Sequence, residues 1–232
     1  MIRTVIFDID GTLYDYSAAN TAAMDALRAY CREHFGWDAE TFKAEHKAAY
    51  DELNHQAAGT AVSHNRLIRY GLMMEKADLS MSHALAMNDL YWGTFLDHME
   101  IFPGLKETLM DLKQAGYRLG IGSNMTADLQ YRKLAKLGIL ELFSFIVTSE
   151  EALAEKPDPA LFQRCIHKAG CEPQECLYIG DEPEKDAAGA EAAGMKALLY
   201  DPAWSYQKRD KLRDDMILVD YMELTTRIGA MN

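Results

Sequence analysis

The chain has 232 residues, of which 49% are hydrophobic and 26% charged, an ordinary composition for a globular protein with a sizeable core. It carries 36 acidic against 24 basic side chains, which gives a formal net charge of −12. This charge argues against nucleic acid and anionic membranes as partners, and no apolar stretch is long enough for a membrane-spanning helix.

The cysteines and the first residues indicate a cytoplasmic protein. The segment MIRTVIFDID reaches its aspartates too early for a secretory signal. Cys31, Cys165, Cys171 and Cys176 form no Cys-x-x-Cys pair, so we interpret them as reduced thiols. A metal or redox pair formed by Cys171 and Cys176 is the alternative.

The N-terminal half of the chain begins with one strand and continues with helices. Residues 3–9 (RTVIFDI) are rich in β-branched residues and predict a buried strand. Residues 15–98 show helical periodicity throughout, broken at segments that contain helix-starting Asp or Ser. The expected helices in this block are 17–34, 39–57, 62–76 and 81–98.

From residue 101 onward, predicted strands and helices alternate. Such alternation with short connections predicts an α/β fold, a Rossmann-like doubly wound parallel sheet with helices on both faces. The helical block interrupts this sheet after its first strand. We therefore expect a core of residues 1–14 and 101–232 with a helical cap, 15–98, inserted between them. The expected strands are 117–124, 143–150, 176–181 and 195–200, with one more near 216–220.

Polar clusters follow the predicted strands, at strand ends or just beyond them. Ligands of open parallel sheets bind outside the carboxyl ends of the strands, so we expect these clusters to lie together. The clusters are Asp8-Ile9-Asp10-Gly11-Thr12, Ser123-Asn124, Glu155-Lys156-Pro157, and Gly180-Asp181 through Asp186.

The chemistry of these clusters indicates a metal-assisted phosphate site. Convergent carboxylates repel one another, so a cation belongs among them, and Mg²⁺ is the common intracellular cation with all-oxygen ligands. A metal held by few carboxylates keeps positions open for water and a substrate phosphate. Lys156 and Ser123 then suit that phosphate as a point charge and a hydroxyl donor. Backbone N–H groups near Gly11 and Asn124 complete the predicted cradle.

At this point the chain resembles the haloacid dehalogenase superfamily, in the branch with a helical cap inserted after the first motif. The resemblance covers residue 3 to about residue 200. One such motif is weak evidence, whereas four in the family's order, each near a predicted strand end, are strong evidence. The four motifs are Asp8-x-Asp10-Gly11-Thr12, Ser123 after LGIG, Lys156 in EKPDP, and GDEPEKD with Asp181 and Asp186.

The resemblance implies phosphoryl transfer through an aspartyl-phosphate. Asp8 is the expected nucleophile. Asp10 is expected to protonate the leaving oxygen and then to deprotonate the incoming water. The family's metal ligands fall on Asp8, the backbone carbonyl of Asp10, Asp181, and Asp186, the last either directly or through water.

The same resemblance implies the residues around the phosphate. Thr12 and Ser123 are expected to hold phosphate oxygens or to order the loop, and Gly11 and Asn124 to present backbone N–H groups. Lys156 is expected to offset charge on the nucleophile and on the phosphoryl group. Positioning and electrostatics of this kind are what phosphoryl transfer requires.

Asp10 favours phosphatase chemistry over dehalogenation, because the dehalogenases that this chain resembles lack the second aspartate. The main prediction is a Mg²⁺-dependent phosphatase for a small soluble ester, such as a sugar phosphate or a nucleoside monophosphate. A phosphomutase, a phosphonate hydrolase and a non-catalytic binding protein on the same scaffold are the alternatives. The sequence gives no oligomeric state.

Two residues depart from the family pattern of the fourth motif, which often reads Gly-Asp-Ser-x-x-Asn-Asp. Glu182 and Lys185 replace the Ser and the Asn. We interpret Glu182 as a solvated acid, with a place in the metal's outer shell as the alternative, and Lys185 as a surface residue.

The cap offers a few candidates for contact with substrate. Tyr14, Asp15 and Tyr16 form the expected hinge, and Tyr14 is placed among the substrate contacts. Arg66 and Arg69 lie three residues apart on a predicted helix. They form either a solvated face or a contact for an anionic group of the substrate.

Overall fold

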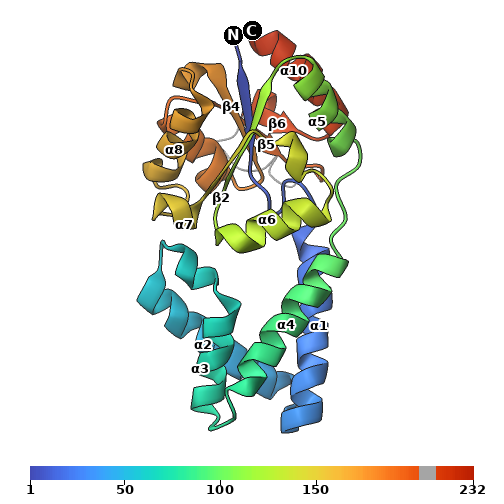
Figure 1. The fold of residues 1–232 in the computed structure, drawn as a ribbon, viewed down its shortest axis with the longest axis vertical. Coiled ribbons are helices and arrows are strands. Elements are labelled where there is room, and N and C mark those ends of the chain that lie inside the picture. Colours follow the sequence, from blue (N-terminus) through green and yellow to red (C-terminus); the bar gives the residue numbers. More distant parts are fainter. Residues whose placement is uncertain (204–212) are drawn as a thin grey trace. The chain divides into compact units, whose positions relative to one another are not determined.

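The computed structural model describes residues 1–203 and 213–232 (Figure 1). The chain divides into two compact units. One unit, here called the core unit, comprises Met1–Asp15 and Glu100–Asn232. The other, here called the cap unit, comprises Tyr16–Met99.

A six-stranded parallel sheet forms the centre of the core unit, with the strand order β3-β2-β1-β4-β5-β6. The strands are β1 Thr4–Phe7, β2 Arg118–Ser123, β3 Phe145–Thr148, β4 Cys176–Gly180, β5 Lys196–Tyr200 and β6 Ile217–Leu218. In this sheet Phe7 pairs with Ile121 on one side and with Ile179 on the other. The strand that carries the first motif therefore lies in the middle of the sheet.

Helices cover both faces of this sheet. Those in the described part of the core unit are α5 Leu105–Gln114, α6 Ala127–Lys136, α7 Ser149–Ala152, α8 Pro159–Ala169, α9 Ala188–Ala192 and α10 Leu224–Met231. Shorter turns are η2 Leu140–Leu142, η3 Pro173–Glu175, the π-helix η4 Pro183–Ala187, η5 Asp214–Met216 and η6 Tyr221–Glu223. Figure 1 shows α8 on one side of the sheet and α5 with α10 on the other.

The strands are almost continuously apolar because both of their faces are buried. On the α8 face, Phe162 is fully buried and its ring lies 5.2 Å from that of Tyr178 in β4. Leu161 and Cys165 of the same helix belong to this cluster, together with Ile6 of β1. Packing on the α8 face therefore fixes β4 beside β1, the two strands that precede the acidic motifs.

The cap unit is helical throughout. Its elements are α1 Tyr16–Phe35, α2 Ala39–Ala57, the short η1 Ala61–His64, α3 Arg66–Lys76 and α4 Ser82–Asp97. Helix α1 packs on α4, and α3 packs on both α4 and α2. Aromatic side chains of α3 and α4 fill the interior, with Tyr70, Tyr91 and Phe95 fully buried.

The prediction of a single helix over residues 62–76 is wrong at the amino-terminal end of that range. The chain forms η1, then turns at Asn65, and α3 begins only at Arg66. The Asn65 side chain accepts a hydrogen bond from the backbone N–H of Ile68 at 3.1 Å, which satisfies an amide at the helix start. An N-cap inside a periodic segment therefore shortens the helix.

The predicted fold class is confirmed: a parallel α/β sheet with a helical insertion, α1–α4, after its first strand. None of the helices formed by the described residues is both long enough and apolar enough to cross a membrane.

Candidate active site

The first and fourth motifs meet because β1 and β4 are parallel neighbours. Strand β1 ends at Phe7 and β4 ends at Gly180, so Asp8 and Asp181 emerge at the same edge of the sheet. The backbone N–H of Asp8 donates to the carbonyl of Ile179 at 2.8 Å, which extends the pairing by one residue. The sheet register thus places two acids 173 positions apart in sequence at one point.

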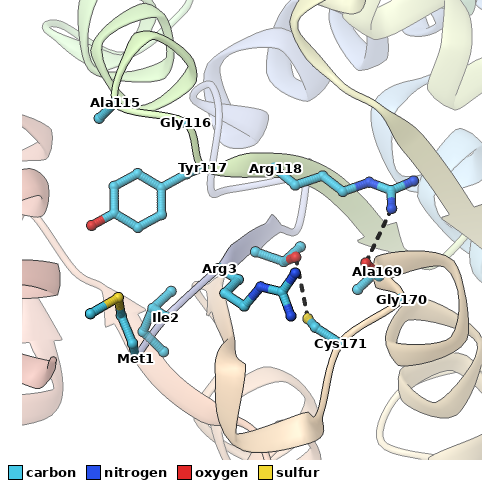
Figure 2. Close-up of a pocket in the computed structure, with 11 residues that line it drawn as sticks. Met1, Ile2, Arg3, Ala115, Gly116, Tyr117, Arg118, Ala169, Gly170 and Cys171 are labelled. Carbon is cyan, nitrogen blue, oxygen red and sulfur yellow. Dashed lines mark hydrogen bonds between the residues drawn. The ribbon is translucent and has the colours of Figure 1, made fainter.

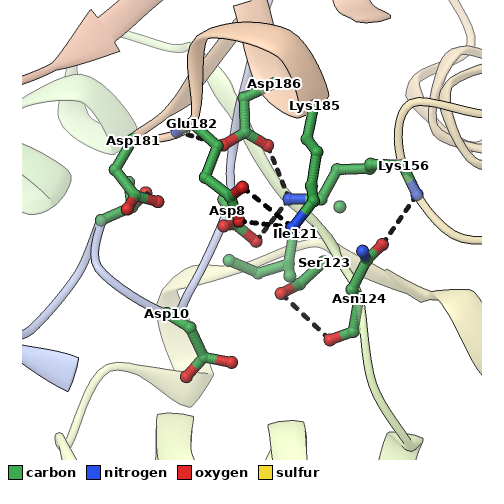
Figure 3. Close-up of polar contacts among 12 residues, drawn as sticks. Asp8, Asp10, Ile121, Ser123, Asn124, Lys156, Asp181, Glu182, Lys185 and Asp186 are labelled. Carbon is green, nitrogen blue, oxygen red and sulfur yellow. Dashed lines mark hydrogen bonds and ion pairs between the residues drawn. The ribbon is translucent and has the colours of Figure 1, made fainter. Parts of the chain in front are cut away.

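Three carboxylates converge there (Figure 3). Asp8, Asp181 and Asp186 each offer one carboxylate oxygen, and these oxygens lie within 4.8 Å of one another. Burial, together with the charges of Asp8 and Asp186, raises the pKa of Asp181 to about 8. Burial and Asp186 raise the pKa of Asp8 to about 6, against the lowering effect of Lys156. Hard oxygen donors that repel one another fit a divalent cation such as Mg²⁺.

The turn after β4 fixes the third carboxylate. Asp186 lies in the π-helix η4 and is 1% exposed. Its Oδ2 accepts a hydrogen bond from the backbone N–H of Glu182 at 2.9 Å. The Glu182 side chain is exposed and pairs with Lys185 at 2.8 Å, outside the group of three carboxylates. This geometry favours the interpretation of Glu182 as a solvated acid.

Lys156 supplies a positive charge beside these carboxylates. Its Nζ lies 2.8 Å from Asp8 Oδ1 and 2.6 Å from Asp186 Oδ1, with the side chain only 3% exposed. Burial by itself lowers the pKa of Lys156, but Asp186 and Asp8 outweigh it and raise that pKa well above its usual value. The ammonium is therefore charged at neutral pH. The backbone N–H of Lys156 donates to Asn124 Oδ1 at 2.8 Å, which ties the third motif to the second.

The loop after β1 approaches Asp181 closely. Gly11 has a φ of +78°, and a Cβ there would lie 2.3 Å from Asp181 Oδ2. Only glycine fits both this conformation and this approach. The Thr12 hydroxyl donates to Asp181 Oδ1 at 3.2 Å and is buried. In this structure Thr12 orders the loop and orients a carboxylate.

Ser123 ends β2 and is 1% exposed. Its Oγ donates to the carbonyl of Asn124 at 3.4 Å and accepts a hydrogen bond from Gln130 Nε2 at 2.8 Å. Gln130 also donates to the carbonyl of Asn124 at 2.7 Å. Gln130 of helix α6 therefore fixes the second motif through hydrogen bonds to Ser123 and Asn124.

The side chain of Asp10 lies apart from the group of three carboxylates and forms its own ion pair. Lys133 Nζ donates to both carboxylate oxygens of Asp10, at 2.6 and 2.8 Å. The Tyr14 hydroxyl donates to the same carboxylate, and Gln130 Nε2 donates to it at 3.4 Å. Burial tends to raise the pKa of Asp10, but Lys133 and these hydrogen bonds lower it below its usual value. Asp10 is thus held as a carboxylate.

The sequence interpretation missed Lys133 and Gln130. Both are 0% exposed, although both are polar. A signal was present, because Gln130, Lys133, Leu134 and Leu137 recur at the spacing of one buried helix face. Polar residues on such a face are candidates for partners of a buried polar group.

The cap candidates are buried rather than solvated. Arg66 is 9% exposed and Arg69 is 4% exposed, so the interpretation as a solvated face is wrong. The α3 face that carries them also carries Tyr70 and Met73, which turns the two arginines toward the interior of the cap unit. Tyr14 is also fully buried, in the core unit.

A separate pocket lies at the opposite, amino-terminal edge of the sheet (Figure 2). It has a volume of about 440 Å³. Its two guanidinium groups already have partners: Arg3 pairs with Glu175 at 3.5 Å, and Arg118 donates to the carbonyl of Ala169 at 3.1 Å. This pocket contains none of the predicted site residues.

The four cysteines are free thiols, as interpreted from the sequence. The Sγ atoms of Cys171 and Cys176 lie 3.5 Å apart. Among the residues that the structure describes, the group of three side chains placed to hold a metal ion is the aspartate group and includes no thiol.

The comparisons with known proteins agree with this geometry. A sequence model of the haloacid dehalogenase-like hydrolase family matches residues 2–194. This chain therefore belongs to the haloacid dehalogenase-like hydrolase family, as the four motifs predicted.

Two curated relatives are phosphatases, which agrees with the predicted enzyme class. One is a ribulose-1,5-bisphosphate 5-phosphatase from Halopiger xanaduensis, 34% identical over 88% of this chain and 86% of its own length. The other is a glyceraldehyde 3-phosphate phosphatase from Methanopyrus kandleri, 33% identical over 93% of this chain and 90% of its own length.

A solved structure with the same overall arrangement is a 2-haloacid dehalogenase from Pseudomonas syringae pv. Tomato. It has a TM-score of 0.78 and 27% sequence identity, and it covers 100% of both chains. The family thus includes proteins named for different reactions, and the site residues have to decide between them.

The Asp10–Lys133 pair generates a stability prediction. Asp10→Asn leaves the buried Lys133 ammonium without its carboxylate, so we expect the free energy of unfolding to fall by about 3 kcal/mol. Adding Lys133→Met should recover more than half of this loss, because no buried charge then remains unpaired. Urea denaturation of the two single variants and the double variant measures the coupling. Additive losses would show that the two side chains do not interact energetically.

The raised pKa of Asp181 generates a prediction for metal binding. At pH 7 a carboxyl with a pKa of about 8 is mostly protonated in the metal-free protein. Mg²⁺ needs the carboxylate, so binding should release close to one proton, and affinity should rise as the pH increases from 6 to 8. Calorimetry in buffers of different ionisation enthalpy measures the release. Asp181→Asn should abolish most of it, whereas an unchanged release would contradict the assignment.

Proposed function

We propose that this protein is a Mg²⁺-dependent phosphomonoester hydrolase that acts on a small phosphate ester. The observation that carries the proposal is the position of Asp8. Its carboxylate lies within the group of three acids that fits a divalent cation, with Lys156 at 2.8 Å. An ionised oxygen in such a place is available as a nucleophile without a separate base.

In the proposed first step, an Asp8 oxygen attacks phosphorus. The bond between phosphorus and the ester oxygen breaks, and that oxygen leaves with a proton as an alcohol. In the second step, water attacks phosphorus, phosphate leaves, and the Asp8 carboxylate is restored. Both steps require in-line positioning and compensation of phosphoryl charge, which the surrounding groups supply.

Asp10 is the proposed proton carrier. Lys133, Gln130 and Tyr14 hold its carboxylate in one orientation. The lowered pKa favours the ionised form, which accepts a proton from the attacking water in the second step. That step leaves Asp10 protonated, and a carboxyl with a low pKa readily gives this proton to the leaving oxygen of the next ester in the first step. Lys133 and Gln130 act through Asp10 and are therefore positioning residues.

Charge compensation is proposed to come from Lys156 and from the cation. Lys156 bridges Asp8 and Asp186 and offers its charge to the phosphoryl oxygens. Asp8, Asp181, Asp186 and the backbone carbonyl of Asp10 would hold Mg²⁺, which supplies Lewis-acid stabilisation of phosphoryl charge when bound. The backbone N–H groups near Gly11 and Asn124 and the hydroxyl of Ser123 complete the proposed phosphate site.

The relatives support sugar phosphates as the substrate class. Both curated phosphatases described above are named for phosphorylated sugars or their fragments, at 34% and 33% identity. We retain nucleoside monophosphates as a second class of small ester. The net charge of −12 argues against nucleic acid or an anionic membrane as a partner. The free cysteines support a cytoplasmic location.

Asp10 favours ester hydrolysis over the reaction named for the dehalogenase neighbour. Displacement of halide from carbon produces a leaving group that needs no proton. A carboxylate that Lys133 holds at 2.6 and 2.8 Å, two residues along the chain from the nucleophile, suits a reaction with an alkoxide leaving group.

Hydrolysis of p-nitrophenyl phosphate tests the proposed function. We expect Mg²⁺-dependent turnover that EDTA abolishes, and a fall in kcat of about 1000-fold or more in Asp8→Asn. Glu182→Gln is the matched control, because this neighbouring acid is exposed and pairs with Lys185. It should retain kcat within about threefold.

Two results would contradict the proposal. Turnover by Asp8→Asn at the wild-type rate would exclude Asp8 as the nucleophile. A folded wild-type protein that binds Mg²⁺ but hydrolyses neither p-nitrophenyl phosphate nor any sugar phosphate or nucleotide tested would favour a phosphomutase or a binding protein.

A further inference from the structure

The pocket at the amino-terminal edge of the sheet contains a thiol. Cys171 is one of the residues that line it, and it is partly exposed, whereas Cys31, Cys165 and Cys176 are buried (Figure 2). Burial also raises the pKa of Cys31 and of Cys165 to about 12. Cys171 is therefore the cysteine that a reagent in solution can reach, and the pocket is where the reagent would lie.

A second thiol lies next to the first. The Sγ atoms of Cys171 and Cys176 are 3.5 Å apart, and a disulfide needs them about 1.5 Å closer. Cys176 begins β4 and pairs with Thr4 of β1, so the sheet holds it in place. Cys171 lies between α8 and η3, outside the sheet, where rotation of its side chain can supply the approach. Burial and the contact with Cys171 raise the pKa of Cys176. Cys171 is thus placed to react first and Cys176 to follow.

Hydrogen bonds fix the turn that joins the two cysteines. The backbone N–H of Glu172 donates to Glu175 Oε2 at 3.1 Å, and the backbone N–H of Glu175 donates to the carbonyl of Glu172 at 2.9 Å. The hydroxyl of the buried Thr4 lies 3.4 Å from Cys171 Sγ, where it can donate to a thiolate. The approach of the two thiols is therefore built into the local structure.

Positive charge lines the same pocket. Arg3 and Arg118 line it together with Cys171, and its volume of about 440 Å³ lies in the range of small-molecule sites. Arg3 contacts Glu175 through Nη1 only, at 3.5 Å, and this pair is exposed. Arg118 contacts the carbonyl of Ala169 through Nη1 as well. A guanidinium carries N–H groups on two further nitrogens, so both side chains can also bind a carboxylate.

We infer that Cys171 and Cys176 form a thiol modification site in this pocket and that its reagent is a small anionic disulfide. Such a reagent carries carboxylates for Arg3 and Arg118 and a sulfur for Cys171. The guanidinium groups raise its local concentration and favour the thiolate of Cys171. The site lies at the opposite edge of the sheet from Asp8, so the inference is independent of the proposed function.

The modification proceeds in two exchange steps. The Cys171 thiol loses its proton and attacks one sulfur of the disulfide. A bond forms between Cys171 Sγ and that sulfur, the S–S bond of the reagent breaks, and the first small thiol leaves with a proton. The Cys176 thiol then loses its proton and attacks Cys171 Sγ, and the second small thiol leaves with that proton. Two protein thiols are oxidised to one disulfide, and one small disulfide is reduced to two thiols.

Oxidised glutathione tests the pair of thiols. The reduced, folded protein is mixed with it, quenched with acid at intervals and mapped by mass spectrometry. We expect a glutathionyl group on Cys171 that gives way to a disulfide between Cys171 and Cys176. In Cys176→Ala the glutathionyl group should last about tenfold longer or more, because the second thiol is missing. Cys31→Ala is the matched control and should follow the wild-type time course.

A neutral reagent tests the role of the charges. The rate at which Cys171 is modified is measured with oxidised glutathione and with bis(2-hydroxyethyl) disulfide, which has no carboxylate. We expect the ratio of the two rates to fall about fivefold when Arg3→Gln and Arg118→Gln are combined. Arg132→Gln is the matched control, because it removes an exposed arginine that does not line the pocket. It should leave the ratio unchanged.

Three results would overturn the inference. One is a folded wild-type protein that forms no Cys171–Cys176 disulfide in excess oxidised glutathione, and this measurement decides even if Cys176→Ala does not fold. Another is a glutathionyl group that lasts equally long in wild type and in Cys176→Ala. The third is a ratio of rates that stays unchanged in the double arginine variant, or in the exposed Arg3→Gln alone if the double variant does not fold.

Discussion

The balance of charge where β1 and β4 end is the constraint on which the site depends. Asp8, Asp181 and Asp186 bring three carboxylates to one point, with oxygens within 4.8 Å, and burial makes their repulsion stronger. Lys156 compensates Asp8 and Asp186, at 2.8 and 2.6 Å. Burial and the charges of Asp8 and Asp186 still raise the pKa of Asp181 to about 8, because they outweigh the lowering effect of Lys156. A divalent cation would compensate the remaining charge, and in the proposed reaction it would also stabilise the phosphoryl group.

The ion pair between Asp10 and Lys133 is separate from the one between Asp8 and Lys156. Asp10 is two residues from Asp8, yet its carboxylate accepts hydrogen bonds from Lys133 of α6, which lowers the pKa of Asp10. Two acids of one motif thereby differ: the pKa of Asp8 is raised and the pKa of Asp10 is lowered. Such a separation assigns different tasks to chemically identical groups, nucleophile and proton carrier in the proposed reaction.

Much of this arrangement was predictable from the sequence, because a parallel sheet places residues that follow its strands at one edge. Asp8, Ser123 and Asp181 each follow or end a strand, and the parallel register of these strands places the three residues at the same edge of the sheet. The sequence showed less of the partners contributed by helix faces. Lys133 lies on the buried face of α6 and Arg66 on that of α3, although cations are usually exposed. The helical spacing indicates which residues share a face, but the carboxylate that Lys133 meets depends on how α6 packs against the loop after β1.

A rapid acid quench of the enzyme during turnover of a phosphorus-labelled ester, followed by peptide mapping, shows whether Asp8 carries the phosphoryl group. We expect labelled protein in the first turnover, with the phosphoryl group on Asp8, and loss of this label at the rate of phosphate release. Label on another residue would contradict it. So would hydrolysis at full rate with no labelled protein at any time, since the ester would then be attacked directly by water.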